Sequence, residues 1–214
     1  MKATVISPQQ DDNLIDRFKQ LDESSRYSEL RRMQGQLRAM RQQLRHQEDI
    51  ISNLRQQAMQ DTLTGVGNRR MFENELELAF SFYRRYGHNG AVLMLDMNDF
   101  KAINDNLGHL AGDAVLKHVA SLLHAHVRDT DVVCRMGGDE FAIILRQVNG
   151  TQAMEKAQRL MYTLANSPCR YLGHDVYLTA SIGWCTFADG HSSAELIKRA
   201  DEHMYKVKET MIPV

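Results

Sequence analysis

The sequence predicts an α/β protein of the α+β type, in which one long helix precedes an antiparallel sheet with flanking helices. Beyond residue 64, helical and strand-like segments alternate in the order β-α-β-β-α-β. That order is typical of a ferredoxin-like sheet with helices on one face. Two apolar runs flank a glycine pair near residue 137, which indicates a hairpin within that sheet. A heptad pattern fills much of the first 60 residues, which predicts the preceding helix.

The N-terminal segment, residues 1–60, is predicted to form a helix that pairs with a second copy as a parallel coiled coil. Spacings of three and four residues alternate along Leu30, Met33, Leu37, Met40, Leu44, Gln47, Ile51, Leu54 and Ala58. A lone helix of this composition has no core to lie on unless it folds back on the following domain. Arginines on this segment could instead form a basic DNA-reading helix, but their spread along the seam favours a solvated face.

Residues 61–214 are predicted to be the globular domain. Helices are expected where apolar residues recur every three or four positions, and strands where apolar residues are continuous. The expected helices span 69–86, 111–127, 151–165 and 193–208, and the expected strands span 91–97, 132–136, 142–145 and 176–184.

Composition narrows the class of protein. With 43% hydrophobic residues and a net charge of −1, the chain can bury a core but lacks the basic excess of a nucleic-acid binder. Its three cysteines have no metal-ligand spacing and are expected to be reduced thiols. No signal-peptide layout or membrane-spanning segment is recognisable in the sequence. We therefore expect a soluble, cytoplasmic protein without a nucleic-acid or membrane partner.

The most specific stretch is Gly-Gly-Asp-Glu-Phe at residues 137–141, the tip of the expected hairpin. Glycines let the backbone turn sharply and let a phosphate approach closely. Carboxylates beside such a surface suit a hard cation such as Mg²⁺. Asp96 ends a strand expected to lie beside the hairpin, so Asp96 and Asp139 can converge. On these residues alone, a plain hairpin tip with solvated strand-end aspartates is the simpler interpretation.

This stretch resembles the signature of the GGDEF family of diguanylate cyclases. Further motifs agree with the resemblance: Asp61-Thr62-Leu63-Thr64-Gly65 with Asn68-Arg69-Arg70, Asp96 to Asp113, Ala180-Ser181-Ile182-Gly183, and Arg199-Ala200-Asp201 with Tyr205 and Lys208. The resemblance implies a palm-type fold and the condensation of two GTP molecules to cyclic di-GMP and two pyrophosphates. Each domain would hold one GTP, so two domains would meet face to face in a homodimer joined by the coiled coil.

The resemblance also implies roles for individual residues. The expected Mg²⁺ ligands, with Mn²⁺ as the alternative cation, are Asp96, Asp139, Glu140 and the backbone carbonyl of Met97. The sequence leaves open whether Glu140 binds metal or assists the 3′-hydroxyl proton. Asn104 and Asp113 are expected to read guanine, although Asn104 could be only a turn former and Asp113 also a helix N-cap. The remaining expected site residues are Gly137 and Gly138 in the catalytic turn and Phe100, Lys101 and Lys208 at the substrate.

Arg128 and Asp131 form an Arg-x-x-Asp motif that resembles the inhibitory product site of the family. Arg159 matches the auxiliary arginine of that site. Arginine forks suit guanine acceptors and phosphates, so cyclic di-GMP is the expected feedback ligand. The alternative is an ordinary surface turn with a salt bridge.

Two positions depart from the family pattern. Asn98 stands where a second aspartate is usual, and we expect activity to survive this change. Ile212 stands where an arginine often helps to hold the triphosphate, so affinity for GTP could be lower. Two other functions stay open: a catalytically idle cyclic di-GMP receptor, and a coiled-coil module whose globular part only transmits a signal. The intact signature argues against the idle receptor.

Overall fold

The computed structural model describes residues 22–211, and for residues 51–57 it describes the backbone alone. The chain divides into two compact units, with the division between Arg55 and Gln56. Residues 1–21 of the predicted N-terminal segment, and the departure at Ile212, lie outside the described residues.

One long helix, α2 (Glu23–Gln57), makes up the described part of the first unit and ends two residues beyond it, and the predicted N-terminal helix is confirmed over this range. Asp22 caps its start, because the Asp22 carboxylate accepts a hydrogen bond from the Ser25 amide at 2.8 Å. The predicted seam is exposed on the single chain, at 42–66% for Leu30, Met33, Leu37, Met40 and Leu44. The side chains of Ile51 and Leu54 lie outside the described residues. An exposed apolar stripe favours pairing, which stays a prediction.

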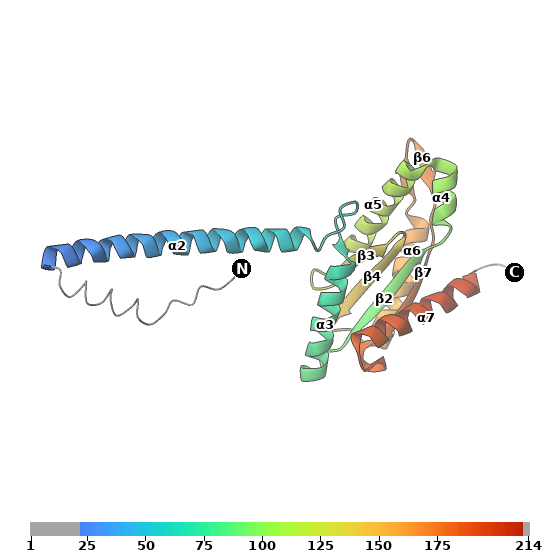
Figure 1. The fold of residues 1–214 in the computed structure, drawn as a ribbon. Coiled ribbons are helices and arrows are strands. Elements are labelled where there is room, and N and C mark those ends of the chain that lie inside the picture. Colours follow the sequence, from blue (N-terminus) through green and yellow to red (C-terminus); the bar gives the residue numbers. More distant parts are fainter. Residues whose placement is uncertain (1–21, 212–214) are drawn as a thin grey trace. The chain divides into compact units, whose positions relative to one another are not determined.

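A five-stranded sheet forms the centre of the second unit, with the strand order β1-β3-β4-β2-β7 (Figure 1). Neighbouring strands are antiparallel except for β1, which runs parallel to β3 at one edge. The order of the four long strands confirms the predicted ferredoxin-like arrangement. The strands are β1 (Gly67–Asn68), β2 (Gly90–Met97), β3 (Val132–Gly137), β4 (Glu140–Arg146) and β7 (Ala180–Thr186).

Helices cover both faces of the sheet, so the prediction of helices on one face is wrong (Figure 1). On β2, Leu93 and Leu95 pack with α5 and α6, whereas Val92 and Met94 pack with α3 and α7. The physical reason is that every residue of β2 from Gly90 to Leu95 is buried, which requires cover on both sides. The helices are α3 (Arg69–Tyr86), α4 (Phe100–Leu107), α5 (His109–Ala125), α6 (Gly150–Asn166) and α7 (Ser193–Met211).

The structure differs from two of the predicted elements and contains one helix that was not predicted. Helix α4 was not predicted because it is short and buries no residue completely. Helix α5 begins at His109, so Asp113 lies inside the helix and is not its N-cap. The segment predicted as one strand over 176–184 is divided between two strands. Its first residue ends β6 (His174–Val176), which forms a hairpin with β5 (Cys169–Tyr171), and its last five residues belong to β7. Strands of three residues are too short to show a period.

The three cysteines are free and buried. Burial raises the pKa of the Cys134 thiol to about 12 and that of Cys185 to about 11, so neither thiol ionises near neutral pH. Among residues 22–211, no helix has the length and apolar character needed to cross a membrane.

Candidate functional site

The carboxylates of the signature lie at the end of β2 where the β3–β4 hairpin turns. Asp96 is directly opposite Glu140 in the register of β2 and β4. The Met97 amide donates a hydrogen bond to the Asp139 carbonyl at 3.4 Å, so the turn lies beside the end of β2. In the sheet, β2 lies between β4 and β7, so the end of β2 lies next to the start of β4. The fold thus brings Asp96 close to two consecutive acidic residues, Asp139 and Glu140, that lie far from it in sequence.

Two glycines shape the hairpin turn. Gly137 has φ of 150° and Gly138 has φ of 52°, and both values are unfavourable for residues with a side chain. The register of β3 and β4 shifts between Arg135 and Gly137, which re-aims the turn. The signature glycines therefore have a geometric role in presenting Asp139 and Glu140.

Arg135 fastens this turn to the start of the domain. Its Nε and one terminal nitrogen donate to the Gly138 carbonyl at 2.9 and 2.7 Å, and its other terminal nitrogen lies 3.2 Å from Asp61 Oδ1. Asp61 also accepts hydrogen bonds from the Thr64 amide at 2.9 Å and the Thr64 hydroxyl at 2.6 Å. Sequence reasoning noted the Asp61 motif but assigned Arg135 no role, since it stands in an otherwise apolar strand.

The charge balance at this edge is negative. Partial burial and the nearby charges of Asp96, Asp139 and Asp201 raise the pKa of Glu140. Lys208, from α7, donates a hydrogen bond to Asp96 Oδ1, and this bond raises the pKa of Lys208. One ammonium group therefore partly offsets several carboxylates.

The donor chemistry of this edge fits a hard divalent cation. Among the described residues, no three His, Cys, Asp or Glu side chains are grouped closely enough to hold a metal by themselves. Mg²⁺ typically needs only one or two carboxylates, because waters and substrate phosphates fill its other positions. Asp96 and Asp139, with the Met97 carbonyl, could supply that partial set.

The predicted base-reading residues lie across the junction of α4 and α5. Asn104 is on α4, Asp113 is on α5, and both are half-buried. Gly112 permits this packing, because a Cβ there would lie 2.0 Å from Asn104 Oδ1 and 3.2 Å from the Phe100 ring. Sequence reasoning missed Gly112, and an apolar run around one glycine gave little signal. Lys101 is exposed on the same helix as Asn104.

Asn98 is held against β7. Its side-chain oxygen accepts a hydrogen bond from the Ser181 hydroxyl at 3.0 Å, and its side-chain nitrogen donates to Thr179 Oγ1 at 3.1 Å. An ionised aspartate has no donor, so it could bond to Thr179 only by accepting a hydrogen bond from the Thr179 hydroxyl. The amide at position 98 therefore fits its surroundings.

A separate cavity of about 220 Å³ unites the three predicted inhibitory-site residues, Arg128, Asp131 and Arg159. Asp131 also holds the local backbone in place. Its carboxylate accepts hydrogen bonds from the backbone amides of Arg128 and Arg146, both at 3.0 Å. The motif thus includes an ordered turn, and the two arginines line the cavity from different elements.

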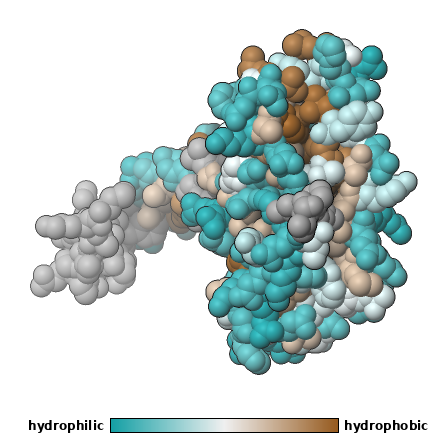
Figure 2. Space-filling view, turned by 90° about the vertical axis from the view of Figure 1, so that its right-hand side faces the viewer, coloured by the Kyte–Doolittle hydropathy of each residue, from teal (hydrophilic) through white to brown (hydrophobic). Residues whose placement is uncertain are grey.

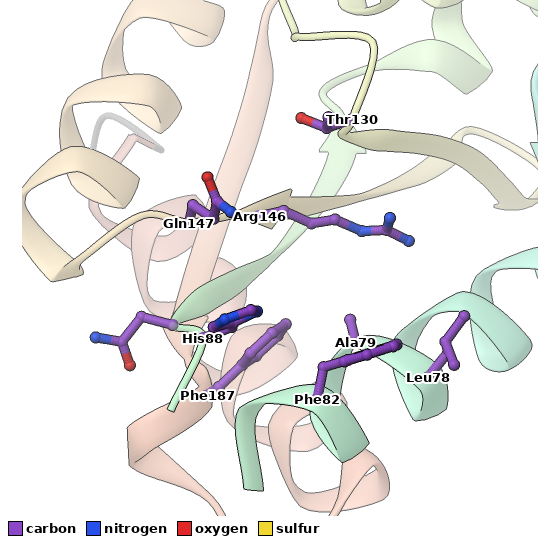
Figure 3. A pocket seen from close by; sticks show the side chains of 9 residues that line it. Leu78, Ala79, Phe82, His88, Thr130, Arg146, Gln147 and Phe187 are labelled. Atoms are coloured by element: carbon purple, nitrogen blue, oxygen red, sulfur yellow. The ribbon is translucent and has the colours of Figure 1, made fainter. Parts of the chain in front are cut away.

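A more apolar cavity, of about 300 Å³, lies at the opposite end of β2 from Asp96 (Figure 3). The rings of Phe82, His88 and Phe187 line it, and the Arg146 side chain extends along one side. Arg146 pairs with Glu75 at 2.5 Å, whereas its buried Nε has no hydrogen-bond partner among the described residues. None of the predicted site residues lines this cavity.

The family relationship agrees with this geometry. Residues 58–212 match the family described as "Diguanylate cyclase, GGDEF domain". The chain belongs to the GGDEF family. The diguanylate cyclase DgcP of Pseudomonas aeruginosa is 31% identical over 179 residues, which are 84% of this chain and 27% of DgcP. The diguanylate cyclase TpbB of the same species is 35% identical over 164 residues, which are 75% of this chain and 38% of TpbB. The chain thus spans well under half the length of these relatives.

Solved structures share the GGDEF fold. A crystal structure of the coiled coil and GGDEF domain of DgcB from Caulobacter crescentus, in complex with c-di-GMP, has a TM-score of 0.75 and 24% identity, and covers 84% of this chain and 95% of that one. The diguanylate cyclase SiaD of Pseudomonas aeruginosa, solved with its activator SiaC, has a TM-score of 0.73 and 28% identity, and covers 95% of this chain and 78% of that one.

Proposed function

We propose that this chain is a diguanylate cyclase that condenses two GTP molecules to cyclic di-GMP and two pyrophosphates. The observation that carries the proposal is the meeting of Asp96, Asp139 and Glu140 at the hairpin turn. Family membership supports it, since the relatives DgcP and TpbB are named diguanylate cyclases.

The base would be read between α4 and α5. Asn104 and Asp113 offer an amide and a carboxylate, which match the O6 acceptor and the N1 and N2 donors of guanine. Phe100 adds an apolar surface beside Asn104. Lys101 and Lys208 supply positive charge for the phosphates, and the open backbone at Gly137 and Gly138 leaves room for their approach. GTP is therefore the nucleotide that suits the site.

In the reaction, the 3′-hydroxyl of one GTP attacks the α-phosphorus of the other, and the bond to pyrophosphate breaks. Asp96, Asp139 and the Met97 carbonyl would hold Mg²⁺ or Mn²⁺, which supplies charge neutralisation at the phosphates and activation of the hydroxyl. Glu140, opposite Asp96, would either complete the metal site or receive the 3′ proton. Lys208 would then turn from Asp96 toward the triphosphate.

One domain holds one GTP, so the complete reaction needs two domains. The exposed seam of α2 would join two copies as a parallel coiled coil and raise the local concentration of one domain at the other. The structure of DgcB with both a coiled coil and a GGDEF domain supports this arrangement.

The cavity of Arg128, Asp131 and Arg159 would bind cyclic di-GMP as feedback inhibitor. Its two guanidinium groups suit the phosphates and guanine edges of the product. An idle receptor would use this cavity alone, and the intact carboxylates at the hairpin favour the enzyme over that alternative.

The test is incubation of the full chain with GTP and Mg²⁺, followed by separation of the nucleotides. Wild type should form cyclic di-GMP, whereas Asp139→Ala and Asp96→Ala should form none and still unfold cooperatively near the wild-type midpoint. Near wild-type turnover in either variant at saturating Mg²⁺ would show that the metal assignment is wrong. Binding of added cyclic di-GMP without turnover by wild type would favour the receptor.

A further inference from the structure

Four large apolar side chains are exposed at one end of the second unit. Leu110 is 74% exposed and Leu172 is 82% exposed, and Leu107 and Tyr177 are also exposed. We call these four residues the apical patch. Figure 2 shows hydrophobic residues at the top of the domain, where Figure 1 places α4, α5 and the β5–β6 hairpin.

The fold draws these residues together from three segments. Leu107 and Tyr177 line one hollow of about 430 Å³. Leu110 follows Leu107 after the turn at Gly108, where α4 gives way to α5. Leu172 is at the tip of the β5–β6 hairpin, whose strand β5 packs against α5.

Leu172 is unusual in its backbone as well as in its exposure. Leu172 and Gly173 have φ of 47° and 86°, so the two-residue hairpin has left-handed backbone at both central positions. Asn or Gly is favoured at the first of these positions, and a bulky residue there is disfavoured. A leucine that is both strained and exposed contributes little to folding this domain, so its side chain is better explained by a contact outside the domain.

The patch adjoins the candidate catalytic edge. Its hollow is also lined by Asn98 and Asp99, which follow Asp96 directly along the chain after Met97. The backbone amide of Asn98 donates a hydrogen bond to the Thr179 carbonyl at 2.9 Å, so the segment that carries Tyr177 is fixed beside this edge.

We propose that the apical patch docks on a second copy of this chain when two GTP-loaded domains face each other. The inference rests on the proposed function, because the two-GTP reaction is incomplete without a second domain at this edge. The apolar surface next to the predicted base-reading segment then lies where the partner domain must approach.

The size of the patch suits a temporary contact. A stable interface buries roughly 800 Å² on each partner, which four side chains cannot supply alone. A weak interface can open to admit GTP and release product. It would depend on the coiled coil to keep the second domain near.

The experiment compares Leu110→Glu and Leu172→Asn in the full chain with Tyr162→Glu as the control. Tyr162 lies on α6 and is 71% exposed, so the control also removes a large exposed side chain. We expect both patch variants to lose at least about tenfold in turnover, while the control stays near wild type. Leu172→Asn should unfold at or above the wild-type temperature because asparagine tolerates the left-handed backbone. Affinity for 3′-deoxy-GTP, which cannot react, should stay within about twofold of wild type.

A second measurement detects the contact itself. Leu172→Cys should cross-link between copies with a short bifunctional maleimide, and more strongly with 3′-deoxy-GTP and Mg²⁺ than without them. Tyr162→Cys should not show this dependence. Wild-type turnover in both patch variants, or a loss matched by weaker 3′-deoxy-GTP binding, would overturn the docking proposal alone. Absence of cyclic di-GMP from wild type would overturn the proposed function and the docking together.

Discussion

Arg135 and Asp61 form an ion pair at 3.2 Å although they are 74 positions apart in the sequence. The same guanidinium donates hydrogen bonds to the Gly138 carbonyl. The Arg135 side chain therefore connects Asp61, near the start of the domain, to the signature turn. Both side chains are largely shielded from water, with 15% of Arg135 and 22% of Asp61 exposed. This ion pair is therefore expected to stabilise the fold more than a solvent-exposed salt bridge does.

We expect Asp61→Asn to reduce turnover and to lower the free energy of unfolding at pH 7 by about 1–3 kcal/mol. Partial burial pushes the pKa of Asp61 upward, but hydrogen bonds from Thr64 and Arg135 outweigh it and hold this pKa below its usual value. A depressed pKa stabilises the fold above the unfolded-state pKa of about 4, and this stabilisation is lost as pH falls through the folded-state pKa.

Urea unfolding at several pH values would test this. The stability difference between wild type and Asp61→Asn should shrink in acid. Glu73→Gln is the matched control, because Glu73 pairs with Arg69 at 3.6 Å on an exposed surface and should contribute almost nothing. A difference that is independent of pH would contradict the role of the Asp61 charge.

Gly112→Ala should weaken GTP binding without unfolding the domain. The added Cβ would lie 2.0 Å from Asn104 Oδ1, so the Asn104 side chain must move. Loss of one aligned hydrogen bond to guanine should raise KM for GTP by roughly tenfold. Gly150→Ala is the control: it is also helical, and its Cβ would meet neighbours only at 3.7 Å or more. An unchanged KM in Gly112→Ala would remove Asn104 from the base-reading site.

The sequence predicted the order of the sheet and the hairpin because apolar runs and glycines are local signals. It did not predict that β2 needs helices on both faces, although its continuous apolar run carried that information. Helix α4 was not predicted because it has only eight residues and none of them is fully buried. The periodicity of a segment predicts how long an element is and how far it is buried. It does not predict as well which other elements pack against it.

The same limit applies to the candidate site. Asp96 and Glu140 are acidic residues at the ends of apolar runs, so the sequence pattern predicts them as site residues. It does not predict Arg135 and Gly112, because their roles depend on contacts between segments that are distant in sequence. An arginine in a strand and a glycine in a helix have no local signature of the carbonyl or side chain that they will contact.

Lys208→Met should have opposite effects on metal and nucleotide. Lys208 donates a hydrogen bond to Asp96, so its removal frees a carboxylate for a cation. We expect Mg²⁺ alone to raise the thermal midpoint more in the variant than in wild type. KM for GTP should nevertheless increase, by about tenfold or more, because the charge proposed to bind phosphate is lost. Calorimetry with Mg²⁺ and steady-state kinetics measure the two effects. Equal loss of both affinities would show that Lys208 only supports the fold.

Activity should depend on the seam of α2. Leu37→Lys combined with Leu44→Lys would place like charges along the exposed stripe, and it should separate a two-stranded coil. Specific activity should then fall by at least about tenfold at nanomolar protein, because the second domain is no longer held nearby. Arg38→Lys with Arg45→Lys, which keeps the charge at positions outside the predicted seam, is the control. Light scattering would report the mass, and an active monomer at nanomolar concentration would contradict the prediction.

Feedback should be separable from catalysis at Arg128. Asp131 is a poor probe, because its carboxylate also holds the Arg128 and Arg146 amides at 3.0 Å and its loss would disturb the turn. The Arg128 side chain is exposed and lines the cavity with Arg159, so Arg128→Ala should remove the proposed ligand contact with little effect on the fold. The initial rate should stay near wild type, while the final level of cyclic di-GMP rises. Affinity for cyclic di-GMP should fall roughly 10- to 100-fold, by analogy with arginine contacts to guanine in nucleic acids.

Arg159→Ala should give the same pattern, because its guanidinium reaches the same cavity from α6. Lys117→Ala, which removes an exposed positive charge from α5 outside the cavity, should change neither the product level nor the affinity. Calorimetry with cyclic di-GMP and progress curves with GTP give the two readouts. A coupling between distinct sites requires that both arginine variants relieve inhibition without raising KM for GTP. If both bind cyclic di-GMP as tightly as wild type does, the Arg-x-x-Asp segment is only an ordered turn, and the inhibition must be sought elsewhere.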